Sequence, residues 1–267
     1  MGAGIAHAFL VAGANVVLVE RDDDSVESAR GRVHASVTKA SEKFGFDVAE
    51  ALARIEFSTD YASFGVVDLV VEAVPEDFGL KVSALTRVEQ NLSALAWLTT
   101  NTSSLSITQI AEELKYPEQF CGLHFFNPVP LSSLVEVVLA PQTSAELAAL
   151  ASTWVRGLGK TPIVVNDAPG FASSRLGVAI ALEAMRMLEE GVASAEDIDN
   201  AMVLGYRHAT GPLKTTDLVG LDVRLHIAEY LEEHLGERFA PPQILRDMVA
   251  RGELGRKSGK GFFDYSR

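Results

Sequence analysis

The sequence predicts an α/β domain built on a mostly parallel sheet, followed by an all-α domain. In the first part of the chain, short apolar runs typical of buried strands alternate with amphipathic helical stretches, as expected for parallel strands joined by helices. Further along, only helical patterns remain. Between the two parts, the segment Asp-Ala-Pro-Gly-Phe contains a proline and a glycine, which end one element before the next begins. We therefore expect one domain over residues 1–167 and a second over residues 168–267.

The first domain is expected to begin with an amphipathic helix over residues 2–12 and a strand over residues 15–19. A charged helical stretch follows over residues 24–56, and most of its charge is expected to form a solvated helix face. Continuous apolar runs predict strands covered on both faces, as in a parallel sheet. These runs lie at residues 55–58, 66–74, 96–100, around Cys121, at 134–138 and at 161–165.

The second domain is expected to be purely helical, with helices over residues 171–190, 195–204, 213–235 and 241–250. The first of these helices carries a stripe of apolar side chains at nearly helical spacing. We expect the stripe to serve in packing rather than in chemistry. Its members are Leu176, Ile180, Ala184 and Met187.

Composition excludes several classes of protein. A chain of 267 residues with 48% hydrophobic content can form one or two domains with sizeable cores. The formal net charge of −13 argues against binding to nucleic acid or to an anionic membrane surface, and no segment is long and apolar enough to cross a bilayer. Cys121 is the single cysteine, so we expect no disulfide and a buried thiol rather than a nucleophile. We expect a cytoplasmic protein with no metal site.

Four polar side chains stand at or near the ends of apolar runs: Ser103, His124, Asn127 and Glu136. Ligands bind at such strand ends in parallel α/β sheets, because the loops there surround a crevice. Histidine titrates near neutrality and commonly accepts the proton when an alcohol is oxidised. A carboxylate behind the histidine would fix its tautomer and favour the imidazolium. The alternative is a core histidine with no catalytic role, but the three polar neighbours favour a catalytic site.

The start of the chain matches only part of a dinucleotide-binding pattern, which runs strand, G-x-G-x-x-G, helix, strand and acid. Gly2 corresponds to the last glycine, which allows close helix–strand packing, and Glu20 to the acid that holds the adenosine ribose. Glu20 favours NAD over NADP, although Arg21 weakens this preference. The first strand and the two earlier glycines have no counterpart. A chain truly beginning at Met1 should be unstable or bind NAD weakly, so we expect a misplaced start or an internal fragment.

Several blocks of the sequence resemble the short-chain L-3-hydroxyacyl-CoA dehydrogenase family, which includes 3-hydroxybutyryl-CoA dehydrogenases. The resemblance implies a Rossmann-like NAD-binding domain that lacks its first strand here, and a helical domain that closes the substrate cleft and forms a homodimer. It also implies an acyl-CoA substrate. The blocks that carry it, in order along nearly the whole chain, are G-A-G-I-A, E-A-V-P-E-D, N-T-S-S-L, G-L-H-F-F-N-P-V-P, L-V-E-V-V, D-A-P-G-F, G-P-L-K-T-T-D-L-V-G-L-D and G-R-K-S-G-K-G-F-F-D-Y.

The resemblance assigns further binding residues. Ser36 and Lys43 match positions that contact the nucleotide end of coenzyme A. Glu76 and Lys81 match positions that touch the nicotinamide ribose, although a simple surface ion pair between them is an alternative. Three more residues complete the set: Asn101 at a strand end should approach the nicotinamide, Ser103 should also lie near the cofactor, and Ser174 stands where the family has an asparagine near the substrate carbonyl.

The activity implied is reversible, NAD-dependent oxidation of an L-3-hydroxyacyl-CoA to the 3-ketoacyl-CoA. His124 would remove the hydroxyl proton as hydride leaves C3, Glu136 would orient the imidazole, and Ser103 and Asn127 would hydrogen-bond the reacting oxygen or the thioester carbonyl. Two alternatives stay open. One is a dehydrogenase of the same fold that acts on a hydroxy acid or sugar acid without CoA. The other is a truncated, non-catalytic member of the family.

Overall fold

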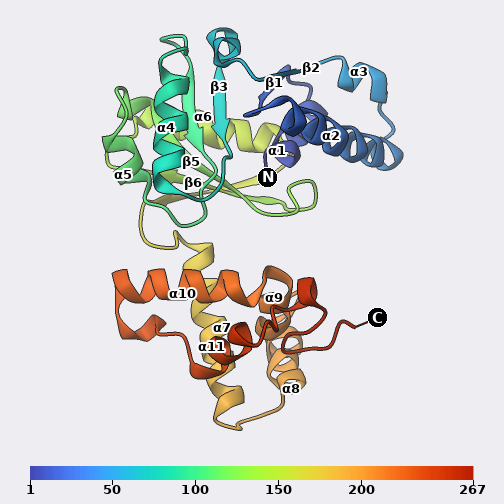
Figure 1. Cartoon of the computed structure of the whole chain (residues 1–267), viewed down its shortest axis with the longest axis vertical. Helices are drawn as coiled ribbons and strands as arrows, with labels where there is room; N and C mark the ends of the chain where they lie inside the picture. Colours follow the sequence, from blue (N-terminus) through green and yellow to red (C-terminus); the bar gives the residue numbers. More distant parts are fainter. Residues whose placement is uncertain (267) are drawn as a thin grey trace. The chain divides into compact units, whose positions relative to one another are not determined.

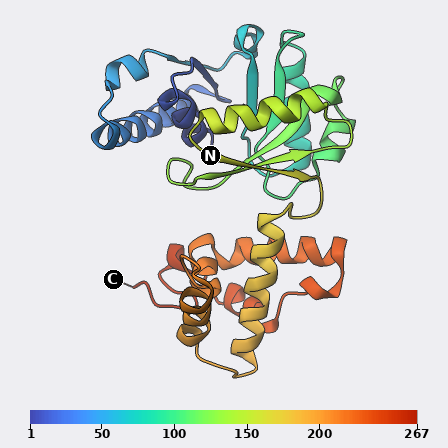
Figure 2. The ribbon, with the colours of Figure 1, turned by 180° about the vertical axis from the view of Figure 1, so that it is seen from behind.

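A computed structural model describes residues 1–266. The chain divides into two compact units, one over Met1–Asp167 and the other beginning at Ala168. The first unit mixes strands and helices, whereas the second is built from helices and short turns (Figures 1 and 2). The predicted fold class, a mostly parallel α/β domain followed by a helical domain, is therefore confirmed.

The first unit contains two sheets. A two-stranded parallel sheet joins β1 (Val16–Val19) to β2 (Ile55–Ser58). A five-stranded sheet has the order β3-β4-β5-β6-β7, with all neighbours parallel except β5 and β6. Its strands are β3 (Leu69–Glu72), β4 (Trp97–Thr100), β5 (Phe120–Phe125), β6 (Leu134–Leu139) and β7 (Thr161–Asn166).

Helices cover both faces of the larger sheet. In Figures 1 and 2, α6 lies across one face and α4 and α5 across the other. Ile5 and Ala8 of α1 enter the apolar cluster of β5, β6 and α6, while Ala6 and Leu10 enter a second cluster with β1 and α2. Helix α1 thus joins the two sheets into one unit. The helices are α1 (Gly2–Val11), α2 (Asp23–Phe44), α3 (Val48–Leu52), α4 (Phe78–Glu89), α5 (Ile107–Glu112) and α6 (Ala145–Gly157), with 3₁₀ turns at Tyr61–Val66 and Pro117–Gln119.

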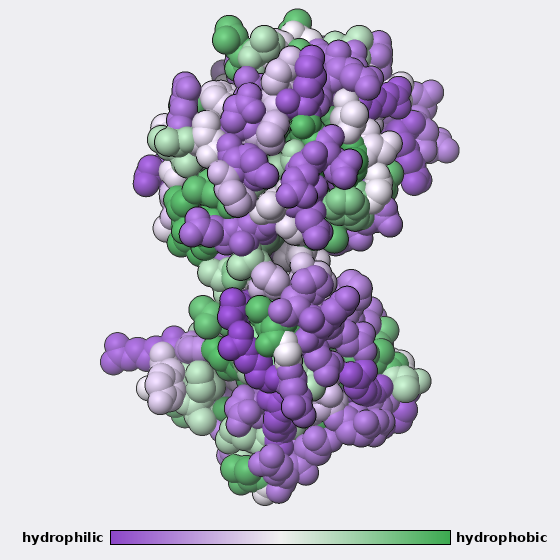
Figure 3. Space-filling view, turned by 90° about the vertical axis from the view of Figure 1, so that its left-hand side faces the viewer, coloured by the Kyte–Doolittle hydropathy of each residue, from purple (hydrophilic) through white to green (hydrophobic). Residues whose placement is uncertain are grey.

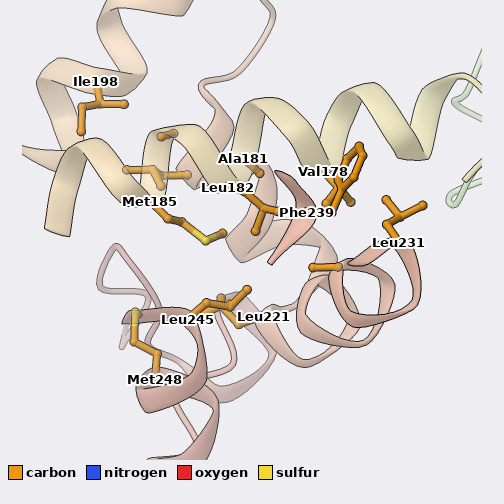
Figure 4. Close-up of a cluster of buried hydrophobic side chains, with 13 residues drawn as sticks. Val178, Ala181, Leu182, Met185, Ile198, Leu221, Leu231, Phe239, Leu245 and Met248 are labelled. Carbon is orange, nitrogen blue, oxygen red and sulfur yellow. The ribbon is translucent and has the colours of Figure 1, made fainter. Parts of the chain in front are cut away.

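The helical unit packs around one apolar core that α7 shares with the helices after it (Figure 4). Four side chains of α7 lie in this core: Val178, Ala181, Leu182 and Met185. The helices are α7 (Ser173–Glu189), α8 (Ala195–Asn200), α9 (Pro212–Val219), α10 (Leu221–Leu235) and α11 (Gln243–Ala250), with a π-helical turn at Ala201–Gly205 and 3₁₀ turns at Glu237–Phe239 and Arg256–Ser258. On the face in Figure 3, hydrophilic side chains cover most of the surface, with smaller hydrophobic patches among them.

Three element boundaries differ from the sequence-based prediction. The helix expected over residues 24–56 ends at Gly45, whose φ of 72° is left-handed and stops α2. The strand expected over residues 66–74 shortens to β3, because a 3₁₀ helix occupies the residues before it. The helix expected over residues 213–235 splits into α9 and α10 at Gly220, where φ is 106°.

Only part of the predicted packing stripe on α7 lies in the core of the helical unit. Leu176 is 64% exposed and Ile180 is 38% exposed, so these two side chains lie on the outer face of the helix. Ala184 does belong to the core, and Met187 packs against it. A periodic apolar stripe therefore located the helix but not the side of it that is buried.

Candidate active site

His124 and Glu136 form a buried pair across two strands. They lie directly opposite each other in the antiparallel pairing of β5 with β6, which puts their side chains on the same face of the sheet. Nδ1 of His124 lies 2.7 Å from Oε2 of Glu136, with the histidine 4% exposed and the carboxylate fully buried. The ring of Phe126 packs against the imidazole, with 4.5 Å between the ring centroids. The pair is thus shielded from water on the carboxylate side.

The turn after β4 carries Ser103 and is fastened by Glu76. Oε1 of Glu76 accepts hydrogen bonds from the Thr102 hydroxyl at 2.6 Å, the Ser103 N–H at 2.8 Å, the Ser104 N–H at 3.0 Å and the Ser104 hydroxyl at 3.1 Å. Burial alone would raise the pKa of Glu76, but the Thr102 hydroxyl, the Lys81 ammonium and the two N–H groups together hold it below its usual value. Glu76 is therefore an anion near neutral pH.

Lys81 is buried, so the alternative of a surface ion pair is wrong. Its side chain is fully inaccessible, and Nζ donates to Glu72 Oε1 at 3.0 Å and to the Val74 carbonyl at 3.1 Å. Oε2 of Glu76 is 3.6 Å away. The predicted contact of Lys81 with the nicotinamide ribose stays a prediction, and this geometry favours an action through Glu76.

Sequence reasoning missed Glu72, the main partner of Lys81. Its side chain is 3% exposed, and its carboxylate also accepts from the Val74 N–H and from the Thr100 hydroxyl at the end of β4. An acid within the apolar run before Glu76 was the available signal, because a carboxylate in a buried strand requires a cation or several donors.

Asn101 and Asn127 occupy different environments. Asn101 is buried, and its side-chain oxygen accepts the Phe125 N–H at 2.9 Å, while its own N–H donates to the Glu72 carbonyl at 2.7 Å. These contacts link the ends of β3, β4 and β5. Asn127 is exposed in the loop after β5. Ser103 is half-buried in the turn after β4. The hydroxyl and the carboxamide thus come from the loops that follow two adjacent parallel strands.

Glu20 follows β1 at the edge of a hollow of about 450 Å³. The same hollow is lined by Ser28 and Arg32 from α2, and also by Arg21, Asp22, Asp24 and Ser25. A carboxylate acceptor next to hydroxyl and guanidinium donors fits the two hydroxyls of a ribose. The residues present therefore fit the adenosine end of a dinucleotide.

The close helix packing predicted at Gly2 occurs at Gly4 instead. A Cβ atom at Gly2 would lie 3.9 Å from the Cβ of Ala73, an ordinary van der Waals distance. At Gly4 it would lie 3.2 Å from two carbon atoms of Val129. Space is thus tight at Gly4, two residues further along α1, where the helix meets the loop after β5.

Ser36 has a partner that the sequence did not predict. Its hydroxyl lies 3.0 Å from Nδ1 of His7, a buried residue of α1. Burial, with a smaller contribution from the positive charge of Lys160, lowers the pKa of His7, so this imidazole is neutral near pH 7. Lys43 is exposed two helical turns beyond Ser36 on the same face of α2. The contacts of Ser36 and Lys43 with coenzyme A stay predictions.

Ser174 lies half-buried in the first turn of α7, in the helical unit. Within residues 1–266, no group of three or more histidine, cysteine or acidic side chains is arranged to hold a metal ion. None of the helices in this described part of the chain combines the length and the apolar composition needed to cross a membrane.

Comparison with known proteins agrees with this geometry. Residues 1–168 match the NAD binding domain of 3-hydroxyacyl-CoA dehydrogenase, and residues 170–265 match its C-terminal domain. A probable 3-hydroxybutyryl-CoA dehydrogenase of Deinococcus radiodurans is 42% identical, over 99% of this chain and 96% of that protein. A 3-hydroxybutyryl-CoA dehydrogenase of Clostridioides difficile is 36% identical, over 100% of this chain and 96% of that protein.

Solved structures give the same result. The crystal structure of (S)-3-hydroxybutyryl-CoA dehydrogenase from Ralstonia eutropha is similar to this chain with a TM-score of 0.95 and 39% sequence identity, covering 100% of this chain and 96% of that one. The similarity extends over both units. The chain therefore belongs to the 3-hydroxyacyl-CoA dehydrogenase family and is an NAD-dependent oxidoreductase.

Proposed function

We propose that this protein catalyses the reversible oxidation of an L-3-hydroxyacyl-CoA, such as 3-hydroxybutyryl-CoA, to the 3-ketoacyl-CoA with NAD. The observation that carries the proposal is the buried contact of 2.7 Å between His124 and Glu136. A histidine backed by a carboxylate is the arrangement that removes a proton from an alcohol. The relatives named as 3-hydroxybutyryl-CoA dehydrogenases support the choice of substrate.

The proton goes to Nε2 of His124. When Nδ1 carries a hydrogen and donates it to Glu136, Nε2 holds the lone pair that can accept the hydroxyl proton of C3. As this O–H bond and the C3–H bond break, the C3–O bond becomes a carbonyl, and the carboxylate of Glu136 stabilises the imidazolium that forms. Bound NAD supplies the hydride acceptor. Ser103 and Asn127 would hold the reacting oxygen or the thioester carbonyl by hydrogen bonds.

The cofactor would be held along the strand ends of the first unit. Glu20 would accept from the adenosine ribose, and α1 would begin beside the pyrophosphate at Gly2. Asn101 and Glu76 would lie toward the nicotinamide end, with Lys81 holding Glu76 from behind. On the substrate side, Ser36 and Lys43 would contact the nucleotide portion of coenzyme A. Ser174 would take the place of the family's asparagine near the substrate carbonyl, where its shorter hydroxyl reaches less far.

We also propose that the protein forms a homodimer through its helical unit. Exposed apolar side chains support this: Leu176 and Ile180 lie one turn apart on the outer face of α7, and Val223 of α10 is 41% exposed. Leu176→Glu should convert a dimer to a monomer in light scattering; a monomeric wild type would contradict the proposal. We place the protein in the cytoplasm, in keeping with its buried, unpaired thiol.

The test of the proposed reaction is the oxidation of NADH by acetoacetyl-CoA, followed by absorbance. Wild type should turn over, and His124→Gln should lose about 10²–10⁴-fold in kcat, because in this direction His124 gives the proton to the carbonyl oxygen as general acid. Folding of the variant is checked by thermal unfolding. Turnover of free acetoacetate at the rate of the thioester would favour a hydroxy-acid dehydrogenase instead. A folded wild type that binds NADH but turns over neither substrate would favour a non-catalytic protein.

A further inference from the structure

One oxygen atom of Glu76 accepts hydrogen bonds from three consecutive residues of the turn after β4. Thr102, Ser103 and Ser104 all donate to Oε1, two of them through backbone N–H groups. Hydrogen bonds to a carboxylate are shorter and stronger than those to a neutral acceptor. We call this arrangement the Glu76 clasp. It restrains the backbone of Ser103 itself, and therefore the position from which the Ser103 hydroxyl projects.

The other oxygen of Glu76 faces a rigid anchor. Oε2 lies 3.6 Å from Nζ of Lys81, whose side chain is fully buried and bonded to Glu72. Glu72 in turn accepts the Thr100 hydroxyl, and its backbone carbonyl accepts the Asn101 N–H at 2.7 Å. The anchor, which is the Lys81–Glu72 pair, is therefore hydrogen-bonded to Thr100 and Asn101, immediately before the turn. The clasp and the anchor hold this segment from both sides.

We propose that Glu76 is a positioning residue, which fixes the Thr102–Ser104 turn between the buried Lys81–Glu72 pair and β4 and so sets the place of the Ser103 hydroxyl for the reaction. This inference rests on the proposed function, because it assigns Ser103 to the reacting oxygen. It separates two roles of Glu76: any contact with the cofactor, and the restraint of the turn. Displacement of a catalytic hydroxyl lowers the rate of the chemical step without requiring weaker cofactor binding.

The clasp can be weakened without touching Glu76. Thr102→Val removes the shortest bond of the clasp, together with the bond that the Thr102 hydroxyl accepts from the Leu105 N–H at 3.0 Å, and keeps the side-chain shape. A direct contact of Glu76 with the cofactor is left in place. Thr99→Val is the matched control. Thr99 is equally buried and lies on β4, before the turn. Its hydroxyl donates to the Val70 carbonyl at 2.8 Å, outside the clasp. Thr102→Ser restores the hydroxyl.

Two measurements test the proposal. In NADH-linked reduction of acetoacetyl-CoA, Thr102→Val should lose about 10- to 100-fold in kcat, with little change in the dissociation constant of NADH measured by fluorescence. Thr99→Val should keep kcat, and Thr102→Ser should recover it. Hydrogen exchange gives a second readout that needs no substrate. The Ser103 and Ser104 amides, which donate to Glu76, should exchange faster in Thr102→Val than in Thr99→Val.

The outcomes separate the inference from the proposed reaction. Equal losses of kcat in Thr102→Val and Thr99→Val would overturn the positioning role, because general destabilisation would explain both. Loss of NADH affinity at unchanged kcat in Thr102→Val would also overturn it. If the wild type does not reduce acetoacetyl-CoA but the two amides exchange faster in Thr102→Val alone, the proposed reaction fails while the clasp itself is supported.

Discussion

Two carboxylates are buried in the five-stranded sheet, Glu136 on β6 and Glu72 on β3, and their surroundings differ. Glu136 lies against the imidazole of His124, which is charged only when it is protonated. Glu72 lies against the ammonium of Lys81 and accepts further bonds from the Val74 N–H and the Thr100 hydroxyl. One carboxylate thus faces an imidazole, the residue type that takes part in proton transfer, and the other faces the ammonium of an ion pair.

The difference separates a centre suited to proton transfer from one suited to holding the fold. Burying a charge is costly unless it is paired and hydrogen-bonded, and the Glu72 site meets that requirement at all times. At the Glu136 site the charge pair becomes complete only when His124 takes a proton, which is the event required during alcohol oxidation. Mutations at the first site should therefore lower kcat with little change in stability, whereas mutations at the second should lower stability and, through the Glu76 clasp, kcat as well.

The largest effect is expected for Glu136→Gln. The amide is neutral and can no longer stabilise the imidazolium, so kcat for acetoacetyl-CoA reduction should fall by about 10²–10⁴-fold. The shape of the side chain is kept, and the midpoint of thermal unfolding should change little. A variant that keeps wild-type kcat would show that the carboxylate has no part in proton transfer.

Lys81→Met should lower the stability of the protein, which Glu136→Gln leaves nearly unchanged, and it should also lower kcat because Lys81 anchors the Glu76 clasp. It leaves the Glu72 carboxylate buried without its cation, and the free energy of unfolding should fall by about 3–5 kcal/mol in urea titrations. The matched control is Glu27→Gln, which breaks the exposed ion pair with Arg30 on α2 and should cost about 0–1 kcal/mol. Equal losses for the two variants would mean that the buried pair contributes no more than a surface pair.

Gly122→Ala tests how tightly β5 is enclosed beside His124. A Cβ at Gly122 would lie 2.9 Å from carbon atoms of both Ile107 and Val138, so overpacking should cost about 1–3 kcal/mol. Gly31→Ala is the control on the exposed face of α2, where nothing lies within 4 Å. It should stabilise the protein by about 0.5–1 kcal/mol. A neutral Gly122→Ala would indicate that β5 is free to shift.

The smallest perturbation is chemical labelling of Cys121, also on β5. Burial raises the pKa of this thiol to about 12, so in the folded protein it stays protonated and unreactive at pH 8. Ellman's reagent should react with one thiol per chain only after unfolding in urea. Rapid reaction of the folded protein would show that β5 opens readily and does not hold His124 in a fixed place.

Much of this could be predicted from the sequence. The alternation of apolar runs with amphipathic stretches predicted the fold class, and the ordered blocks predicted the family; both predictions are confirmed. His124 and Glu136 were also singled out as a pair. These features are readable because strand and helix periodicity is local, and because each block lies within a short stretch of chain.

Partners distant in the sequence could not be predicted. A surface pair of Lys81 with Glu76 was the alternative to a cofactor contact, but Lys81 is buried and its closest partner is Glu72, nine residues away. Ser36 meets His7 across 29 residues of chain, and the Thr100 hydroxyl meets Glu72 across 28. Periodicity also failed to show which face of α7 is exposed at Leu176, because that depends on what the other helices cover.

The sequence by itself therefore determined which elements form, to which family the chain belongs, and which side chains could transfer a proton. Only the tertiary structure decided which buried carboxylate meets an imidazole and which meets an ammonium. The physical reason is that the charge and shape of a side chain belong to the residue, whereas burial and the choice of partner are set by strands and helices that come together from distant parts of the chain.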